Sequence, residues 1–400
     1  MSAWLWLGGC ALGLFILELA QRRLFPGDSA LLAWLGRTRW REDSLGSDSE
    51  RGVSSLRVIS AEDLVPGFAG LAKRISREPT ERAESRIRKR LSKAKTEAAR
   101  AVLSCLLSEV ELHKGDPEEA HALIQEAGQR LAQFWRDRDD RFQLAAEILL
   151  EFEALFHLRQ GRCANVRQIL WDGRSRFGQR AWMIEVEAQV LLLEGHTGRC
   201  RDLLGGSSTA NVEGANAGVL DRKRLLLEAE SYVLDRSPVA LRQVLDRLNN
   251  ETGLSLCERV ALTRMQIESF LAAADFPGAW RRWGTLHRLA VSENGNRALK
   301  RVYHLACAQL QLVEGNTTEA HRQIQLALND STYPVARWEA GVVLGMILEV
   351  EGRFADAVVV WNGLREEAAG SRYHVVATAH LLELAEAPAV TEPSVVAAVP

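Results

Sequence analysis

Apolar residues recur every three or four positions along almost the whole chain beyond residue 80, which is the spacing of one face of an α-helix. The pattern is interrupted at regular intervals by glycine or by other turn-forming residues. These breaks are 34 to 46 residues apart and fall at Gly115, Gly161, Gly195, Asp235, Ala274, Gly315 and Gly352. An interval of this size predicts an array of helical repeats.

One helix start occurs twice in the chain. The stretch GDPEEAHALIQEA begins at Gly115, GNTTEAHRQIQLA begins at Gly315, and seven of their thirteen positions are identical. Each repeat is predicted to be a pair of antiparallel helices joined at the break. A single pair cannot bury its own apolar face, so successive pairs are expected to stack on one another.

The clearest repeat spans residues 341–364. Its small residues are expected where helices touch, and Gly352 is expected to form the turn. On these residues the chain resembles the tetratricopeptide repeat (TPR) family. The positions that match the signature of that family are Leu344, Gly345, Gly352, Ala357, Gly315, Ala320 and Ala327. The resemblance covers residues 95–370 and implies an all-α fold, a TPR-like right-handed α-solenoid of about seven helical hairpins. Because the units are long for that family, a looser helical-repeat solenoid remains an alternative.

The N-terminus carries a different pattern. Residues 3–20 are apolar except for Glu18, and as a helix they would span about 27 Å, enough to cross a bilayer. No Lys or Arg precedes this segment, whereas Arg22, Arg23, Arg37, Arg39 and Arg41 follow it. The positive-inside rule therefore predicts one N-terminal transmembrane helix with the rest of the chain in the cytoplasm. The arginine-rich composition favours a bacterial inner (cytoplasmic) membrane.

Five regions are predicted along the chain. Residues 1–21 form the transmembrane anchor, and residues 22–59 a juxtamembrane segment and flexible linker, since 42–55 are polar and rich in serine and glycine. Residues 60–94 are predicted to be a helical, basic entry segment. Residues 95–386 form the helical repeat array, and residues 387–400 a disordered tail.

The strongest local charge lies in residues 82–95, which hold seven basic residues and one acidic residue. Arg86, Arg88, Lys89, Arg90 and Lys93 are candidates for contact with lipid or a partner. A solvated helix face is an equal alternative. Binding of RNA is disfavoured because the segment has no aromatic residue for base stacking.

No motif of an enzyme is found in the chain. The HExxH, GxxxxGK[ST] and GxSxG patterns are absent, and the six cysteines form no CxxC pair. His121 and His321 share one repeat position, which is typical of packing or of solvent exposure. We therefore expect no catalytic residue, no metal, no cofactor and no small-molecule substrate. The net charge of −2 gives no general attraction to nucleic acid, and none is expected as a partner.

The TPR resemblance implies that the first helices of the pairs line a concave groove that binds peptides or partner helices. The residues that it places in the groove are Glu109, Glu151, Glu185, Gln189, Arg222, Tyr232, Arg264, Glu268, Gln309 and Met346. Reversing the charges of Glu151, Glu185 and Glu268 together is expected to leave the fold intact, because groove residues would be exposed. Trp280 and Trp283, beside Arg281 and Arg282, either fill gaps between repeats or form an exposed anchor at an interface.

These features favour a membrane-anchored scaffold that recruits or assembles partner proteins, such as subunits of a membrane complex, at the cytoplasmic face. The scaffold resembles bacterial single-span TPR adaptors of envelope biogenesis or secretion. Two alternatives remain: a mitochondrial-type TPR receptor, and an enzyme with a cryptic site.

Overall fold

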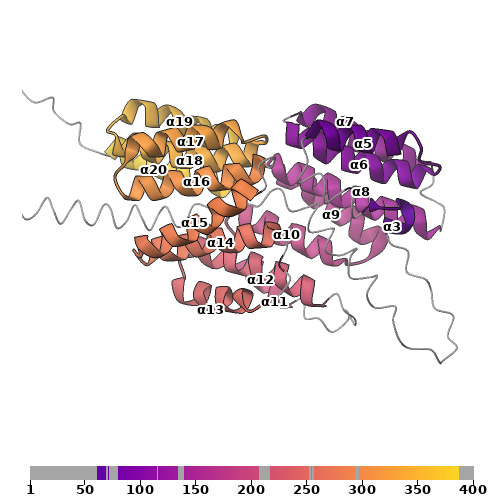
Figure 1. Ribbon diagram of the computed structural model, residues 1–400, viewed down its shortest axis with the longest axis horizontal. Helices are drawn as coiled ribbons and strands as arrows, with labels where there is room; N and C mark the ends of the chain where they lie inside the picture. The colour runs from indigo at the N-terminus through magenta and orange to yellow at the C-terminus, as the bar shows by residue number, and fades with distance from the viewer. Residues whose placement is uncertain are drawn as a thin grey trace, which may run out of the picture.

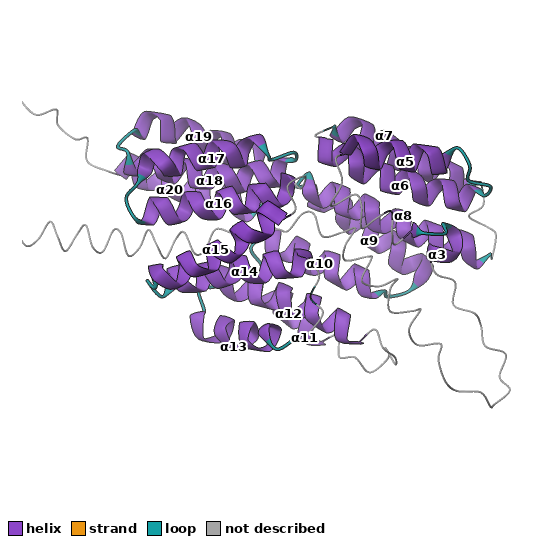
Figure 2. Cartoon of the chain, viewed as in Figure 1, coloured by secondary structure: helices purple, strands orange, loops and turns teal. Residues whose placement is uncertain are grey.

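The computed structural model describes residues 61–68, 71, 80–114, 116–133, 139–206, 217–251, 254, 256–292 and 297–386. Within these residues all regular secondary structure is helical (Figure 2). The predictions made for residues 1–59 and 387–400, including the span at residues 3–20, lie outside the described part of the chain. Among the helices that the structure describes, none is both long enough and apolar enough to cross a membrane.

Seven helix pairs follow one another through the described chain (Figure 1). The first helices are α6 (Glu97–Lys114), α8 (Asp140–Arg159), α10 (Ala181–Leu193), α12 (Ala217–Leu234), α14 (Leu256–Ala272), α16 (Arg297–Val313) and α18 (Pro334–Val350). The second helices are α7 (Pro117–Ala132), α9 (Cys163–Phe177), α11 (Thr197–Gly206), α13 (Pro238–Asn249), α15 (Phe276–Ser292), α17 (Thr317–Asn329) and α19 (Phe354–Glu367). The predicted all-α class is confirmed, and the arrangement is consistent with an α-solenoid.

The same turn joins the helices of the pairs. One residue of the turn is left-handed, and the next N–H bonds to the carbonyl five residues earlier, as when His196 donates to Leu191 at 2.7 Å. The left-handed residues are Gly161, Gly195, Arg236, Ala274, Gly315 and Gly352, with φ between 53° and 82°. The break predicted at Asp235 is therefore wrong by one residue, because Arg236 takes the left-handed place. Gly115 lies outside the described residues.

The duplicated helix start is explained by its cap and by its packing. The side chain of Asp116 accepts a hydrogen bond from the N–H of Glu119 at 3.0 Å, and Asn316 accepts one from Glu319 at 3.3 Å. Ala120 and the equivalent Ala320 have no exposed surface, as expected for helix contacts. The two stretches thus repeat one N-cap and one small residue at the seam between the paired helices.

The array curls until its late helices meet its early ones (Figure 1). Successive first helices contact one another, and α18 also contacts α8. A Cβ built at Gly161, in the turn after α8, would lie 2.2 Å from the ring of Trp338 on α18. A Cβ at Gly195 would lie 3.6 Å from that of Arg372, at the start of α20 (Arg372–Glu386). These contacts bring the two ends of a long stretch of the array together.

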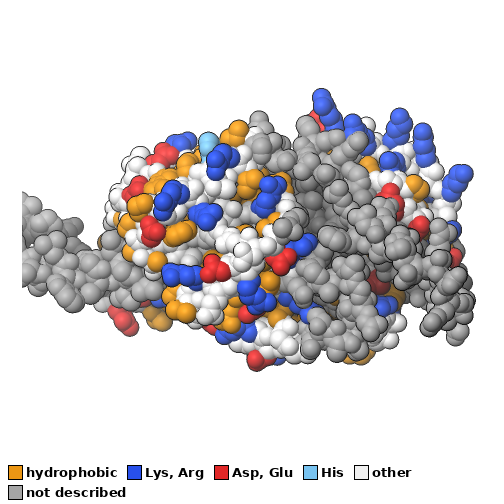
Figure 3. Space-filling model, turned by 60° about the horizontal axis from the view of Figure 1, so that its bottom comes forward, with side chains coloured by type: hydrophobic (Ala, Val, Ile, Leu, Met, Phe, Trp, Pro, Cys, Tyr) orange, Lys and Arg blue, Asp and Glu red, His pale blue; other side chains and the backbone are white. Residues whose placement is uncertain are grey.

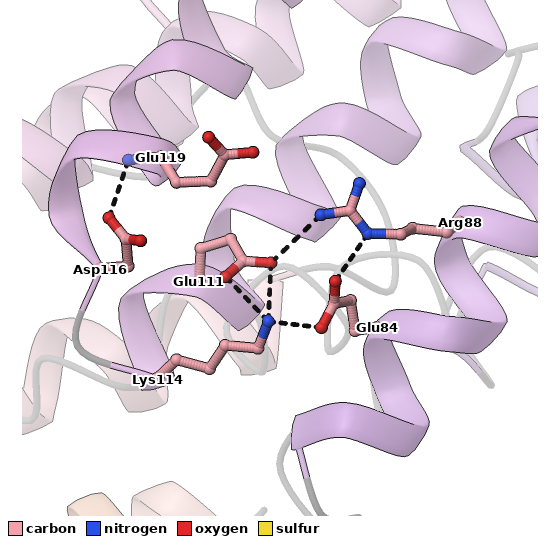
Figure 4. Close-up of polar contacts among 6 residues, drawn as sticks. All are labelled: Glu84, Arg88, Glu111, Lys114, Asp116 and Glu119. Carbon is pink, nitrogen blue, oxygen red and sulfur yellow. Dashed lines mark hydrogen bonds and ion pairs between the residues drawn. The ribbon is translucent and has the colours of Figure 1, made fainter.

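In the described part of the chain, the array is preceded by α3 (Ala61–Leu64) and α5 (Thr80–Leu91), which both pack on α6, and α3 also contacts α8. Phe68 and Ile87 have no exposed surface and belong to the same core as α6 to α8. On the polar side, Glu84 binds Arg88 and Lys114, and both cations also face Glu111 (Figure 4). This network ties α5 to α6, so the basic entry segment is part of the folded body.

The seam between paired helices gives a testable prediction at Ala357, which is fully buried on α19. Replacing Ala357 with leucine adds three carbons to a filled contact and is expected to destabilise the protein by about 1 to 3 kcal/mol. Thermal unfolding followed by circular dichroism measures the change. Val359→Leu on the same helix is the control, because Val359 is 72% exposed and should shift stability by less than about 0.5 kcal/mol. Equal melting temperatures for the two variants would contradict the placement of Ala357 at the contact between the paired helices.

Candidate binding surfaces

The ten residues predicted to line the groove all lie on first helices, from α6 to α18. Two of them, Gln189 and Tyr232, are half-buried, and Tyr232 lies under the guanidinium of Arg201 at 5.0 Å. The buried ones are Glu109, Glu151, Glu185, Arg222, Arg264, Glu268, Gln309 and Met346. All ten residues therefore lie on first helices, but most of their side chains are enclosed in the folded chain.

Ion pairs link several of these buried residues to neighbouring first helices. Arg159 on α8 donates two hydrogen bonds, of 2.8 and 2.9 Å, to the carboxylate of Glu109 on α6. Lys223 on α12 lies 3.2 Å from Glu185 on α10. The Arg159–Glu109 pair is bidentate, the geometry in which a guanidinium binds a carboxylate most strongly.

The largest charged cluster joins helices that are far apart in the sequence. Glu339 on α18 accepts hydrogen bonds from Arg301 on α16 at 2.5 Å and from Arg264 on α14 at 3.4 Å. Arg264 also lies 3.8 Å from Glu230 on α12. All four side chains are at most 4% exposed. We call Glu230, Arg264, Arg301 and Glu339 the inner charge cluster.

Burial governs the electrostatics of this cluster. Loss of hydration raises the pKa of Glu230 well above the usual value for a glutamate, while Arg264 and Arg372 act in the opposite direction. Arg372 is itself buried and donates to the hydroxyl of Tyr373 at 2.9 Å. The start of α20 therefore contributes positive charge to the same interior.

The expectation that Glu151, Glu185 and Glu268 are exposed is wrong. They are 5%, 6% and 2% exposed, respectively. Because their helices curl toward one another, these carboxylates lie inside the array, where reversing a charge costs much more than at a surface. The triple charge reversal is therefore expected to disrupt folding and cannot serve as a test of binding.

The residues predicted from the sequence did not include Arg159, Glu230, Arg301 and Glu339. A signal was present at Glu339, because residues 338–348 of α18 are otherwise apolar. A charge that interrupts such a stretch needs a buried partner. The partner itself was not identifiable, because it lies 38 or 75 residues away.

The candidate basic side chains of the entry segment, in contrast, are exposed. Arg86, Arg88, Lys89, Arg90 and Lys93 all present much of their side chains to solvent. Arg88 is engaged by Glu84 at 2.6 Å, and Arg90 donates to the carbonyl of Pro66. Figure 3 shows Lys and Arg side chains standing out on the right of the molecule, the side on which α5, α6 and α7 lie in Figure 1.

A second surface feature is an aromatic cluster on α15 and α16. Trp283 stacks on His287 and on Tyr303, with ring centroids 5.5 and 5.3 Å apart, and Trp280 meets Trp283 edge to face. Both tryptophans are half-buried. Arg281 and Arg282 lie beside them and are exposed. Aromatic side chains next to arginine are the combination enriched at the centres of protein interfaces.

Two histidines at one repeat position, His121 and His321, and two buried cysteines have packing environments. His121 stacks on Phe156 at 5.2 Å, and the equivalent His321 lies 3.9 Å from Glu351, so each contacts the first helix of the next pair or the turn that follows it. Burial raises the pKa of the Cys200 and Cys307 thiols to about 12, which disfavours the reactive thiolate. Among the described residues, no group of three His, Cys, Asp or Glu side chains could hold a metal ion.

The buried His157 should make the stability of the folded protein depend on pH. Burial is the main cause that lowers its pKa from 6.5 to about 4, with His121 adding to the effect. The unfolded chain therefore binds a proton at higher pH than the folded one, and stability should fall as the pH drops from about 6.5 to 4. His157→Leu should make this fall shallower, whereas the control His196→Leu, at an exposed histidine, should not. Urea unfolding at several pH values measures the slopes, and equal slopes in all three proteins would contradict the assignment.

Comparison with known proteins adds no relative: a scan against protein-family models finds no match, and a search of curated proteins finds no similar sequence.

Proposed function

We propose that this protein is a scaffold for protein–protein interaction, tethered to the cytoplasmic face of a membrane by residues 3–20. The observation that carries the proposal is the array of seven stacked helix pairs. Such arrays offer extended surfaces to partner proteins. The apolar segment and the five arginines that follow it support the tether and its orientation. The TPR resemblance points in the same direction and remains a resemblance.

The partner surface that we propose is the aromatic cluster with Arg281 and Arg282, on the outer helix α15 and its neighbour α16. The inner face is a poorer candidate because its charged residues are buried and engaged with one another. A peptide entering there would have to replace those ion pairs. Binding of a partner at the outer cluster does not require those ion pairs to be replaced. Its two arginines are accessible, and its aromatic rings are held in place by stacking.

Recovery of crosslinked partners from native membranes tests this function. The full chain, tagged at its C-terminus, is crosslinked in its own cells and recovered in mild detergent, in parallel with residues 1–59 carrying the same tag. Partner proteins that are recovered with the full chain, in amounts close to that of the chain itself, should be absent from the sample of residues 1–59. Arg281→Glu with Arg282→Glu should reduce their recovery, and the matched change Arg242→Glu with Arg247→Glu, at exposed arginines of α13, should not. Recovery of the same proteins by residues 1–59 alone would reject the proposal that the array is the scaffold.

A further inference from the structure

One face of a helix outside the array carries a row of positive charge. Arg82, Arg86, Lys89 and Lys93 follow the spacing i, i+4, i+7, i+11, the first three on α5 and Lys93 in the turn that ends it. This spacing places the four side chains in one row along the helix. All four residues are exposed. We call this row the basic stripe.

The acidic and apolar residues of α5 lie on its other faces. Ala83 and Ile87 are buried against the core, which fixes the rotation of the helix. Glu84 is turned toward Arg88 and Lys114, as Figure 4 shows. The remaining acid, Glu81, lies in the first turn of the helix, where a carboxylate complements the helix dipole. The stripe is therefore a positive surface on a helix that the fold holds in one orientation.

We propose that the basic stripe docks the array on an anionic bilayer surface, a proposal that rests on the membrane tether of the proposed function. An anionic bilayer attracts the stripe by its opposite charge. Each Lys or Arg close to the bilayer surface adds to this attraction without needing a specific contact. The exposed residues of α5 include no aromatic or large apolar side chain, so the stripe lacks the anchors of a protein interface and the stacking groups of an RNA site. Docking here places the N-terminal pair of the array against the bilayer.

The position of the stripe in the chain agrees with this partner. About sixty residues separate the end of the apolar segment at Ala20 from the start of α5 at Thr80, enough for α5 to reach the bilayer that holds the tether. Lys300 on α16 lies in the sixth of the seven helix pairs, away from α5 along the array, and serves as the reference lysine in the labelling experiment that follows.

Lysine footprinting of the full chain in lipid nanodiscs tests the proposal. The chain is inserted in discs of neutral phosphatidylcholine or of phosphatidylcholine with phosphatidylglycerol, exposed to an amine-acylating reagent, and analysed by mass spectrometry. Acylation of Lys89 and Lys93 should slow by about tenfold in the anionic discs, while the rate at Lys300 should be unchanged. The protection should disappear in about 1 M salt, where charges are screened beyond about 3 Å.

Arg82→Gln with Arg86→Gln keeps both reporter lysines and should weaken their protection, whereas Arg242→Gln with Arg247→Gln on α13 should not. Equal acylation of Lys89 in neutral and anionic discs would overturn the proposal, as would protection that appears in neutral discs or only when RNA is added. Flotation of the chain with the discs reports the tether separately. A chain that floats with both discs but shows no lipid-dependent protection therefore rejects the stripe and leaves the tether intact.

Discussion

Replacing Glu339 with alanine is expected to lower the free energy of unfolding by about 3 to 5 kcal/mol, the usual cost of breaking a buried ion pair from one side. Glu339 is 2% exposed and faces Arg264 and Arg301, which are 3% and 2% exposed. In the variant both guanidinium groups remain inside the array without this carboxylate. The loss should appear in urea unfolding followed by circular dichroism as a large shift of the midpoint.

The matched control is Arg353→Ala, at a surface cation that binds Glu351 and Asp356. Its side chain is 50% exposed, and removing an exposed ion pair usually changes stability by about 0 to 1 kcal/mol. If Glu339→Ala were no more harmful than Arg353→Ala, the inner charge cluster would not be buried as described. Glu339→Gln should fall between the two, because the amide still accepts one hydrogen bond.

The second large effect is expected at Gly161, which touches Trp338 across the curl of the array. Gly161→Ala should destabilise the protein by about 2 to 5 kcal/mol, from the left-handed backbone and from the overlap of the new methyl group with the indole ring. The backbone φ is 73°, and the added Cβ would lie 2.2 and 2.6 Å from two ring atoms. Thermal unfolding measures the loss.

Gly352 separates the two causes. It occupies the equivalent turn of another pair with the same φ of 73°, but a Cβ added there would meet no atom of the described residues within 4 Å. Gly352→Ala should therefore cost only the backbone part, about 1 to 2 kcal/mol. Adding Trp338→Ala to Gly161→Ala removes the overlap, so the effects of the two changes should not be additive. Equal costs at Gly161 and Gly352 would mean that the indole does not pack on this turn.

The positions of the helix pairs could be predicted from the sequence because one turn is repeated. That turn requires a left-handed residue, and glycine at 161, 195, 315 and 352 makes the requirement visible. Ala274 has no glycine to mark it and was located by aligning the repeats. At the remaining turn Arg236 bears the positive φ of 53°, and with no glycine to mark the place the predicted break fell on Asp235.

The inner face could be predicted only in part. Helical periodicity places Glu109 or Arg264 on a first helix, but it does not say which side chain lies opposite. The partners of Glu339 are 38 and 75 residues away, and no local pattern encodes that approach. The sequence therefore predicted an open groove. In the structure the curl of the array buries much of that face, and its charged residues form ion pairs with one another. Three residues of the basic stripe, Arg86, Lys89 and Lys93, were already candidates in the sequence, whereas Arg82 was added only when the rotation of α5 was known.

The curl is the feature on which the burial of the inner face depends, and a designed disulfide measures it directly. A Cβ at Gly195 would lie 3.6 Å from the Cβ of Arg372, within the separation of about 3.5 to 4.5 Å that disulfides adopt. The two positions lie far apart in the sequence, in the turn after α10 and at the start of α20, so no local contact can join them. A side chain at the left-handed φ of 82° at Gly195 should cost about 1 to 2 kcal/mol, as at Gly352, and the double variant Gly195→Cys with Arg372→Cys should still form an intramolecular disulfide under mild oxidation. The linked peptides should be detected by mass spectrometry and should be absent from each single variant. If both new thiols react freely with a maleimide and no link forms between them, the two ends of this stretch do not meet and the array does not curl.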